Sequence, residues 1–209
     1  LVIAALIYFG LAHRVLDRMK LNDRAALLIV AAMLIGGFVD IPLLRQPLRA
    51  SINLGGGLIP LALVIYLLVG AERTVEWARG LGAAIVPAGL ILFIGSRLDF
   101  DPAQSDLLDP LWLFGLIAGL VGYVLGGRSR RASFVGAVLG LILVDVYHLV
   151  SSVLIRRPAT VSIGGAGAFD AIVIGGLVAV GLAETLGELR ERLAGGPAGE
   201  THEGGEDHK

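Results

Sequence analysis

The stretch SIGGAGAFDAIVIGGLVAVGLAE, residues 162–184, places one aspartate at the start of a run that is otherwise apolar. Gly164, Gly165 and Gly167 come shortly before Asp170, and apolar residues follow it up to Glu184. A carboxylate is costly inside a bilayer, so an acidic residue within a membrane span is by default a candidate functional residue. The rest of the sequence must therefore indicate whether Asp170 lies in a membrane and which residues accompany it.

The composition favours a membrane protein. Of the 209 residues, 56% are hydrophobic and 17% are charged, whereas soluble domains have roughly 45–50% apolar and about 25% charged residues. The apolar residues form continuous blocks without a period of two, which indicates membrane-spanning helices rather than the strands of a barrel. The chain contains no cysteine, so disulfides and thiolate metal sites are excluded.

Seven apolar blocks are bounded by charged residues, glycine or proline, and a membrane span needs about 17–25 residues. The sequence therefore predicts an all-α, polytopic membrane helix bundle with about seven transmembrane helices. We expect one transmembrane domain over residues 1–190 and a disordered polar tail over 191–209. The seven predicted spans are approximately 1–13, 25–44, 54–71, 80–96, 110–127, 132–155 and 167–187.

The distribution of Lys and Arg predicts the orientation of the bundle. If the N-terminus is outside, 12 of the 17 cationic residues fall on the cytoplasmic side and 5 on the opposite side. Cytoplasmic connections carry the excess of positive charge in membrane proteins. We therefore predict a multi-pass protein of the cell (inner) membrane with its N-terminus outside and its C-terminus in the cytoplasm.

Small residues at helical spacing predict close helix packing in the fifth and sixth blocks. Such small-xxx-small patterns let two helices approach each other, and they carry no chemistry of their own. The residues are Gly115, Gly119, Gly122 and Gly126 in the fifth block, and Ser133, Gly136 and Gly140 in the sixth.

Five polar residues stand inside or at the edges of the predicted spans: Asp40, Asn53, Asp145, His148 and Asp170. The predicted topology places all five in the outer half of the bilayer, on four helices. Asp145 and His148 are three residues apart and share one helical face. Asn53 also suits the role of a helix cap. An unpaired buried charge is very costly, so Asp145 must either pair or be neutral.

The segments LVDVYHLV and INLGGGLIPLALVIYLL, together with residues 162–184, resemble a family of prokaryotic multi-pass membrane proteins known only as a domain of unknown function. The most specific segment is the Gly-Gly-Ala-Gly-x-Phe-Asp run from Gly164 to Asp170. This resemblance covers the chain to about residue 190 and implies no activity.

The chain also resembles, more distantly, the presenilins and signal peptide peptidases. These intramembrane aspartyl proteases have one catalytic aspartate in the sixth helix and another, within Gly-x-Gly-Asp, at the start of the seventh. The resemblance implies that Asp145 and Asp170 are catalytic. We accordingly predict that four residues bind substrate and that His148 and Asp40 support the pair. The predicted substrate-binding residues are Gly164, Gly165, Gly167 and Asn53.

The polar residues are open to several interpretations. In an aspartyl hydrolase, Asp145 and Asp170 share a proton and cleave a transmembrane peptide. In a transporter, the same acids and His148 bind a proton or cation. A divalent metal held by Asp145, His148 and Asp170 is a third interpretation, and a non-catalytic membrane scaffold is a fourth. We expect the lipid bilayer as a partner, no nucleic acid and no required cofactor.

Overall fold

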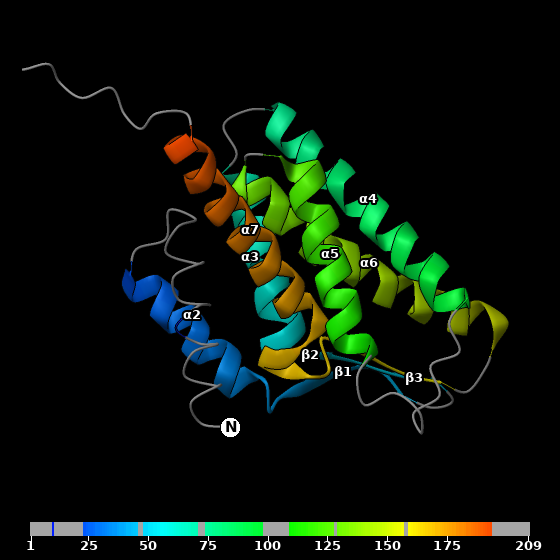
Figure 1. Cartoon of the computed structure of the whole chain (residues 1–209). Coiled ribbons are helices and arrows are strands. Elements are labelled where there is room, and N and C mark those ends of the chain that lie inside the picture. Colours follow the sequence, from blue (N-terminus) through cyan, green and yellow to red (C-terminus); the bar gives the residue numbers. More distant parts are fainter. Residues whose placement is uncertain are drawn as a thin grey trace, which may run out of the picture.

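The computed structural model describes residue 10 and residues 23–45, 48–70, 74–97, 109–127, 129–156 and 159–193. Helices dominate this part of the chain, and a small sheet lies at one end of them (Figure 1). The helices are α2 (Asp23–Gly36), α3 (Ile59–Val69), α4 (Thr74–Arg97), α5 (Pro110–Gly126), α6 (Arg130–Ile155) and α7 (Ala171–Leu193). The strands are β1 (Asp40–Leu44), β2 (Arg49–Asn53) and β3 (Thr160–Ile163). A π-helical turn, η1 (Leu54–Leu58), precedes α3, and a 3-10 turn, η2 (Gly167–Phe169), precedes α7.

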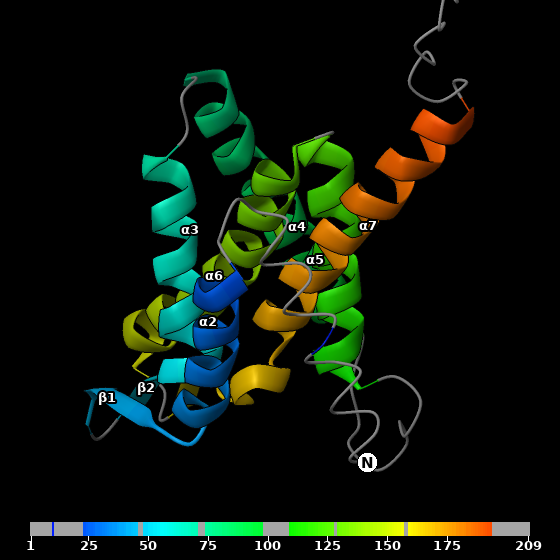
Figure 2. The same cartoon turned by 90° about the vertical axis from the view of Figure 1, so that its left-hand side faces the viewer.

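Helix α6 lies at the centre of the bundle, where it packs against α4, α5 and α7 (Figures 1 and 2). Its side chains Val135, Ala137 and Val138 are almost fully buried. At the start of α6, Arg130 forms an ion pair with Glu184 of α7. The central helix thus contributes much of the apolar core.

The small residues predicted to pack helices together do so. A Cβ atom added at Gly119 would lie 2.5 Å from the side chain of Val178 on α7, and one at Gly122 would lie 2.8 Å from the backbone nitrogen of Ala137 on α6. These spacings are shorter than a carbon atom tolerates, so only glycine fits at these crossings. Gly136 and Gly140 make the corresponding close approach to α4.

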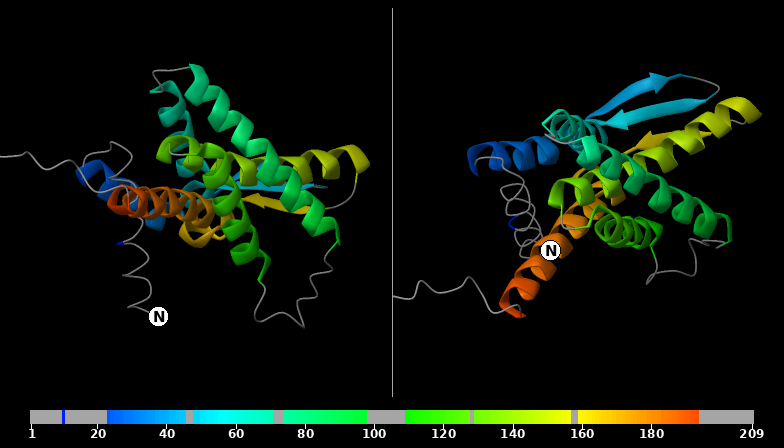
Figure 3. Two further views of the ribbon diagram at one scale, coloured as in Figure 1. Left: turned by 45° about the horizontal axis from the view of Figure 1, so that its top comes forward. Right: turned by 90° about the horizontal axis from the view of Figure 1, so that it is seen from above.

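The sheet has the order β1-β2-β3. Strands β1 and β2 form an antiparallel pair, whereas β2 and β3 are parallel, with Ser51 opposite Ser162. Strand β3 also contacts α6 and runs beside its C-terminal half when the molecule is seen from above (Figure 3). The sheet therefore closes one end of the bundle next to the central helix.

The sheet corrects the all-α prediction and the predicted span 25–44. The helix in that block ends at Gly36, and the chain continues into β1. Gly36 and Gly37 break the helix, and Pro42 could not donate a backbone hydrogen bond inside one. Strand β1 is an edge strand, which is where a sheet tolerates proline.

Two helices among the described residues are long and apolar enough to cross a membrane: Trp77–Arg97 and Arg130–Ile155. Shorter apolar helices cover Arg24–Gly36, Leu54–Val69, Pro110–Gly126 and Ala171–Gly187. The predicted span 1–13 lies outside the described residues, apart from Gly10. Helix α7 runs to Leu193, past the predicted domain boundary at residue 190, and the remainder of the predicted tail is outside the described part.

Candidate functional site

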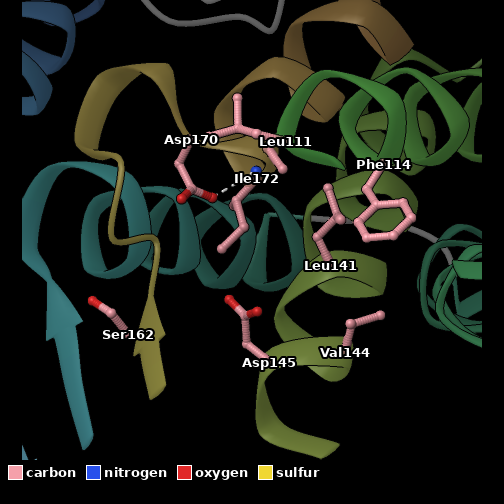
Figure 4. Close-up of a pocket in the computed structure, with 9 residues that line it drawn as sticks. Leu111, Phe114, Leu141, Val144, Asp145, Ser162, Asp170 and Ile172 are labelled. Atoms are coloured by element: carbon pink, nitrogen blue, oxygen red, sulfur yellow. Dashed lines mark hydrogen bonds between the residues drawn. The ribbon is translucent and has the colours of Figure 1, made fainter. Parts of the chain in front are cut away.

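Asp145 and Asp170 line the same cavity, whose volume is about 170 Å³ (Figure 4). Asp145 comes from the second half of α6, and Asp170 directly precedes α7. Their carboxyl groups point toward the space between them and are close enough to interact electrostatically. Ser162 of β3 is the other polar residue of the lining. The rest of the lining is apolar and consists of Leu111, Phe114, Leu141, Val144, Ala171 and Ile172.

Asp170 is the N-cap of α7 rather than a residue of its first turn. Its backbone is extended, with φ −66° and ψ 153°. Oδ1 accepts a hydrogen bond from the Ile172 N–H at 3.0 Å, and Oδ2 accepts one from the Ala166 N–H at 3.1 Å. Both carboxyl oxygens are therefore held by backbone donors.

Asp145 is held by the turn that follows β3. The backbone N–H of Gly164 donates to its carboxyl group. Gly164 has φ +68°, a left-handed conformation that favours glycine. The loop between β3 and α7 thus supplies donors to both acids, from Gly164 to Asp145 and from Ala166 to Asp170.

Ser162 was not among the predicted site residues, although it lines the cavity. Its Oγ accepts a hydrogen bond from Ser51 Oγ at 3.2 Å, across the β2–β3 pair. Successive side chains of a strand point to opposite faces. Buried Ile163 and exposed Ser162 follow that alternation, so the residue would have been found only by predicting a strand at 160–163.

Asn53 belongs to a second polar cluster. Its side chain is fully buried, and Oδ1 accepts hydrogen bonds from the N–H groups of Gly55 and Gly56 at 3.0 and 2.9 Å. Its Nδ2 donates to Gly37 O at 2.9 Å and to Asp40 Oδ1 at 3.0 Å. An amide can make two bonds at each end, so none is left for a substrate. Asn53 therefore caps η1, and its amide group keeps no hydrogen-bonding capacity for the predicted substrate.

Replacement of Asn53 by alanine is expected to destabilise the fold strongly. The change removes the acceptor for two buried N–H groups, and each orphaned group costs about 1–3 kcal/mol. Asp40→Asn is the matched control, because Asp40 is exposed and an asparagine oxygen still accepts the bond from Asn53. Thermal unfolding of the purified proteins in detergent measures both effects. Equal melting temperatures for the two variants would contradict the structural role of Asn53.

Two of the three glycines predicted to bind substrate are enclosed by the chain itself. A Cβ atom at Gly164 would lie 2.3 Å from the carbonyl carbon of Gly56, and one at Gly167 would lie 2.9 Å from Cα of Gly37. Gly165 is exposed. The glycine run therefore interlocks with two other glycine turns at Gly164 and Gly167.

His148 does not join the two aspartates. Its side chain is exposed and makes an edge-to-face contact with the ring of Tyr147, with 5.7 Å between the ring centres. Within the described ranges, no group of three His, Cys, Asp or Glu residues is arranged to hold a metal ion. The predicted convergence of five polar residues is thus resolved into one aspartate pair, one Asn53–Asp40 cluster and a separate His148.

Residues 15–182 match a family model described as Protein of unknown function (DUF1614). The chain belongs to the DUF1614 family. No curated protein and no solved structure shows significant similarity to it. The DUF1614 match includes Asp145, Asp170 and Ser162, as well as the Asn53–Asp40 cluster, and it ends inside α7. All of the candidate residues therefore lie within the family's shared region.

Proposed function

We propose that this DUF1614 protein is a multi-pass protein of the cell (inner) membrane, with its N-terminus outside and its C-terminus in the cytoplasm. Large apolar side chains on the outer surfaces of the helices support this proposal. They recur every three or four residues, for example at Leu116, Leu120 and Val124 of α5, where 51%, 54% and 65% of each residue is exposed. Extended apolar surfaces of this kind are rare on soluble monomers.

In this proposal the seven hydrophobic segments of the sequence form one bundle. Helices α4 and α6 are long enough to cross the hydrocarbon layer. The shorter helices α2, α3, α5 and α7 complete the bundle in the part of the chain that the structure describes. The sheet then lies on the outer side, because its strands belong to connections that this topology places outside, where only 5 of the 17 cationic residues lie.

Cysteine labelling tests the proposed orientation. The chain has no cysteine of its own, so Ser105→Cys and Thr201→Cys each create a single reactive site, the first in the connection 97–109 that the predicted topology places outside and the second in the tail that it places in the cytoplasm. A membrane-impermeant maleimide should label position 105 in intact cells and position 201 only after permeabilisation. Labelling of position 201 alone in intact cells would invert the topology.

The aspartate pair supports the proposal that the protein is an intramembrane aspartyl hydrolase whose substrate is a transmembrane peptide. The observation that carries it is the meeting of Asp145 and Asp170, 25 residues apart in the sequence, across one cavity with largely apolar walls. None of the described residues that line this cavity is cationic. Two adjacent carboxyl groups without a cation favour sharing one proton, which is the state that aspartyl hydrolysis requires.

The pair would divide acid and base roles between its members. The ionised aspartate takes a proton from water as the water oxygen attacks the peptide carbonyl carbon, while the protonated aspartate donates a hydrogen bond to the carbonyl oxygen. Collapse of the tetrahedral intermediate breaks the C–N bond, and the nitrogen leaves with a proton from the pair. The products are a carboxylic acid and an amine, and one water molecule is consumed.

A non-catalytic scaffold is the second candidate function, because Asp170 already serves as the N-cap of α7. Binding of a modified peptide distinguishes the hydrolase from the scaffold. The peptide carries a secondary alcohol in place of the scissile bond and so mimics the tetrahedral intermediate. The wild-type protein should bind this peptide if the pair is hydrolytic. A protein in which both acids are structural should not bind it.

A further inference from the structure

The two aspartates have unequal surroundings. Asp170 has a backbone N–H donor on each carboxyl oxygen, from Ile172 at 3.0 Å and from Ala166 at 3.1 Å. It also stands at the N-terminus of α7, a helix of 23 residues. Backbone donors and the positive end of a helix dipole both stabilise a carboxylate. The negative charge is therefore favoured on Asp170.

Asp145 has fewer donors. Only Gly164 donates a backbone N–H to its carboxyl group among the described residues. The side chain lies in the second half of an apolar helix, between Val144 and Val146 in the sequence. Among the described residues, Asp170 is the only other titratable group that lines its cavity. No lysine, arginine or histidine of α5, α7 or β3 lines that cavity with it. Asp145 thus has fewer groups around it that stabilise a negative charge than Asp170 has.

We propose that the pair is asymmetric, with the negative charge on Asp170 and the shared proton on Asp145. This inference rests on the proposed hydrolase and assigns its two roles. Asp170 is the base that takes a proton from water, and Asp145 is the acid that donates a hydrogen bond to the carbonyl oxygen. The turn at residues 164–167 gives one donor to each acid, so the asymmetry comes from the start of α7, where the Ile172 N–H gives Asp170 a second donor.

A hydrophobic carbodiimide, dicyclohexylcarbodiimide, tests the assignment without a substrate. The reagent reacts with a protonated carboxyl group: the acid proton moves to a carbodiimide nitrogen, and the carboxyl oxygen bonds to the central carbon. The adduct rearranges to a stable N-acylurea without loss of an atom. Peptide mapping by mass spectrometry of the full-length protein in lipid nanodiscs then locates the label.

At neutral pH, we expect at least about tenfold more label on Asp145 than on Asp170, because only the protonated acid reacts. Asp145→Asn should remove the label, and Asp170→Asn should retain it at position 145. Labelling at acidic pH, where both acids are protonated, checks that the reagent reaches both groups. Equal labelling at neutral pH, or more label on Asp170, would overturn the assignment.

Infrared spectroscopy provides a measurement that does not depend on access of the reagent. The C=O stretching band of a protonated carboxyl group should disappear in Asp145→Asn, and a carboxylate band should disappear in Asp170→Asn. The reverse pattern would overturn the assignment but leave the hydrolase intact, since either arrangement holds one proton. Failure of the wild type to bind the alcohol-containing peptide would instead count against the hydrolase itself.

Discussion

Asp145→Asn and Asp170→Asn are each expected to weaken binding of the alcohol-containing peptide by more than about a hundredfold, while both proteins remain folded. Asparagine nearly matches the shape of aspartate but neither ionises nor passes on a proton. At position 170 it still accepts the N–H of Ile172, because asparagine is as good an N-cap as aspartate. The change therefore removes the chemistry and keeps the helix cap, and it gives up only the bond from the Ala166 N–H, which the amide nitrogen cannot accept. Isothermal calorimetry and thermal unfolding measure the two properties separately.

Asp109→Asn is the matched control for this experiment. Asp109 is the N-cap of α5, and its Oδ1 accepts the N–H of Leu111 at 2.9 Å, much as Asp170 accepts that of Ile172. Asp109 is exposed and does not line the cavity. Its asparagine variant should bind the peptide like the wild type. Loss of binding in all three variants would indicate that any change at a helix cap disturbs the site.

The outcome for the double variant decides between the candidate functions. If Asp145→Asn combined with Asp170→Asn binds the peptide as the wild type does, the acids are structural and the hydrolase proposal fails. If peptide binding is absent throughout but the double variant abolishes proton or cation flux in liposomes, the transport interpretation takes its place.

The helices could be predicted from the sequence because their signals are local. Continuous apolar runs of suitable length indicated α4, α5, α6 and α7. Small residues at spacings of three and four indicated which faces meet, as the approach of Gly119 to Val178 confirms. These patterns need no knowledge of distant contacts.

The sheet could not be predicted in the same way. Strands β1, β2 and β3 have four or five residues each and adjoin apolar helices, so their residues read as parts of longer apolar blocks. The partner of Ser51 across the β2–β3 pair is Ser162, 111 positions away. A single sequence offers no local signal for such a pairing.

The candidate site, like the fold, could be predicted only in part. The approach of Asp145 to Asp170 was expected, because an acid in an apolar run needs a partner. His148 was expected to join the two aspartates because it lies on the same helical face as Asp145. It follows Asp145 by three residues on α6, however, and its side chain does not line the cavity. The role of Asn53 depended on the π-helical turn η1, whose glycine N–H groups use its oxygen. Such a turn has no sequence signal beyond the glycines themselves.

The glycine turns connect the fold to the aspartate pair. Gly164 supplies an N–H to Asp145, and Ala166, two residues later, supplies one to Asp170. This loop is fixed in place by backbone contact with Gly56 and Gly57 of η1. Asn53 in turn fixes η1, through the N–H groups of Gly55 and Gly56. The second polar cluster therefore supports the first without contacting it.

Gly164→Ala is consequently expected to destabilise the protein by at least about 3 kcal/mol and to abolish binding of the alcohol-containing peptide. A left-handed backbone costs a residue with a Cβ atom about 1–2 kcal/mol, and Gly164 has φ +68°. The added Cβ would also lie 2.3 Å from the Gly57 nitrogen. Backbone atoms cannot rotate away as a side chain can, so the loop must move and carry its donors away from both acids.

Gly181→Ala and Gly165→Ala are the controls for this effect. No atom lies within 4 Å of a Cβ at Gly181 in α7, so alanine there should raise the stability of the helix by up to about 1 kcal/mol. A Cβ at Gly165 would lie 2.7 Å from Ser162 Oγ, a side-chain atom that can rotate, and its effect should be intermediate. Melting temperatures of the three purified variants give this order directly. If Gly164→Ala instead has the same melting temperature as Gly181→Ala and still binds the peptide, the interlocked turns do not hold the aspartate pair in place.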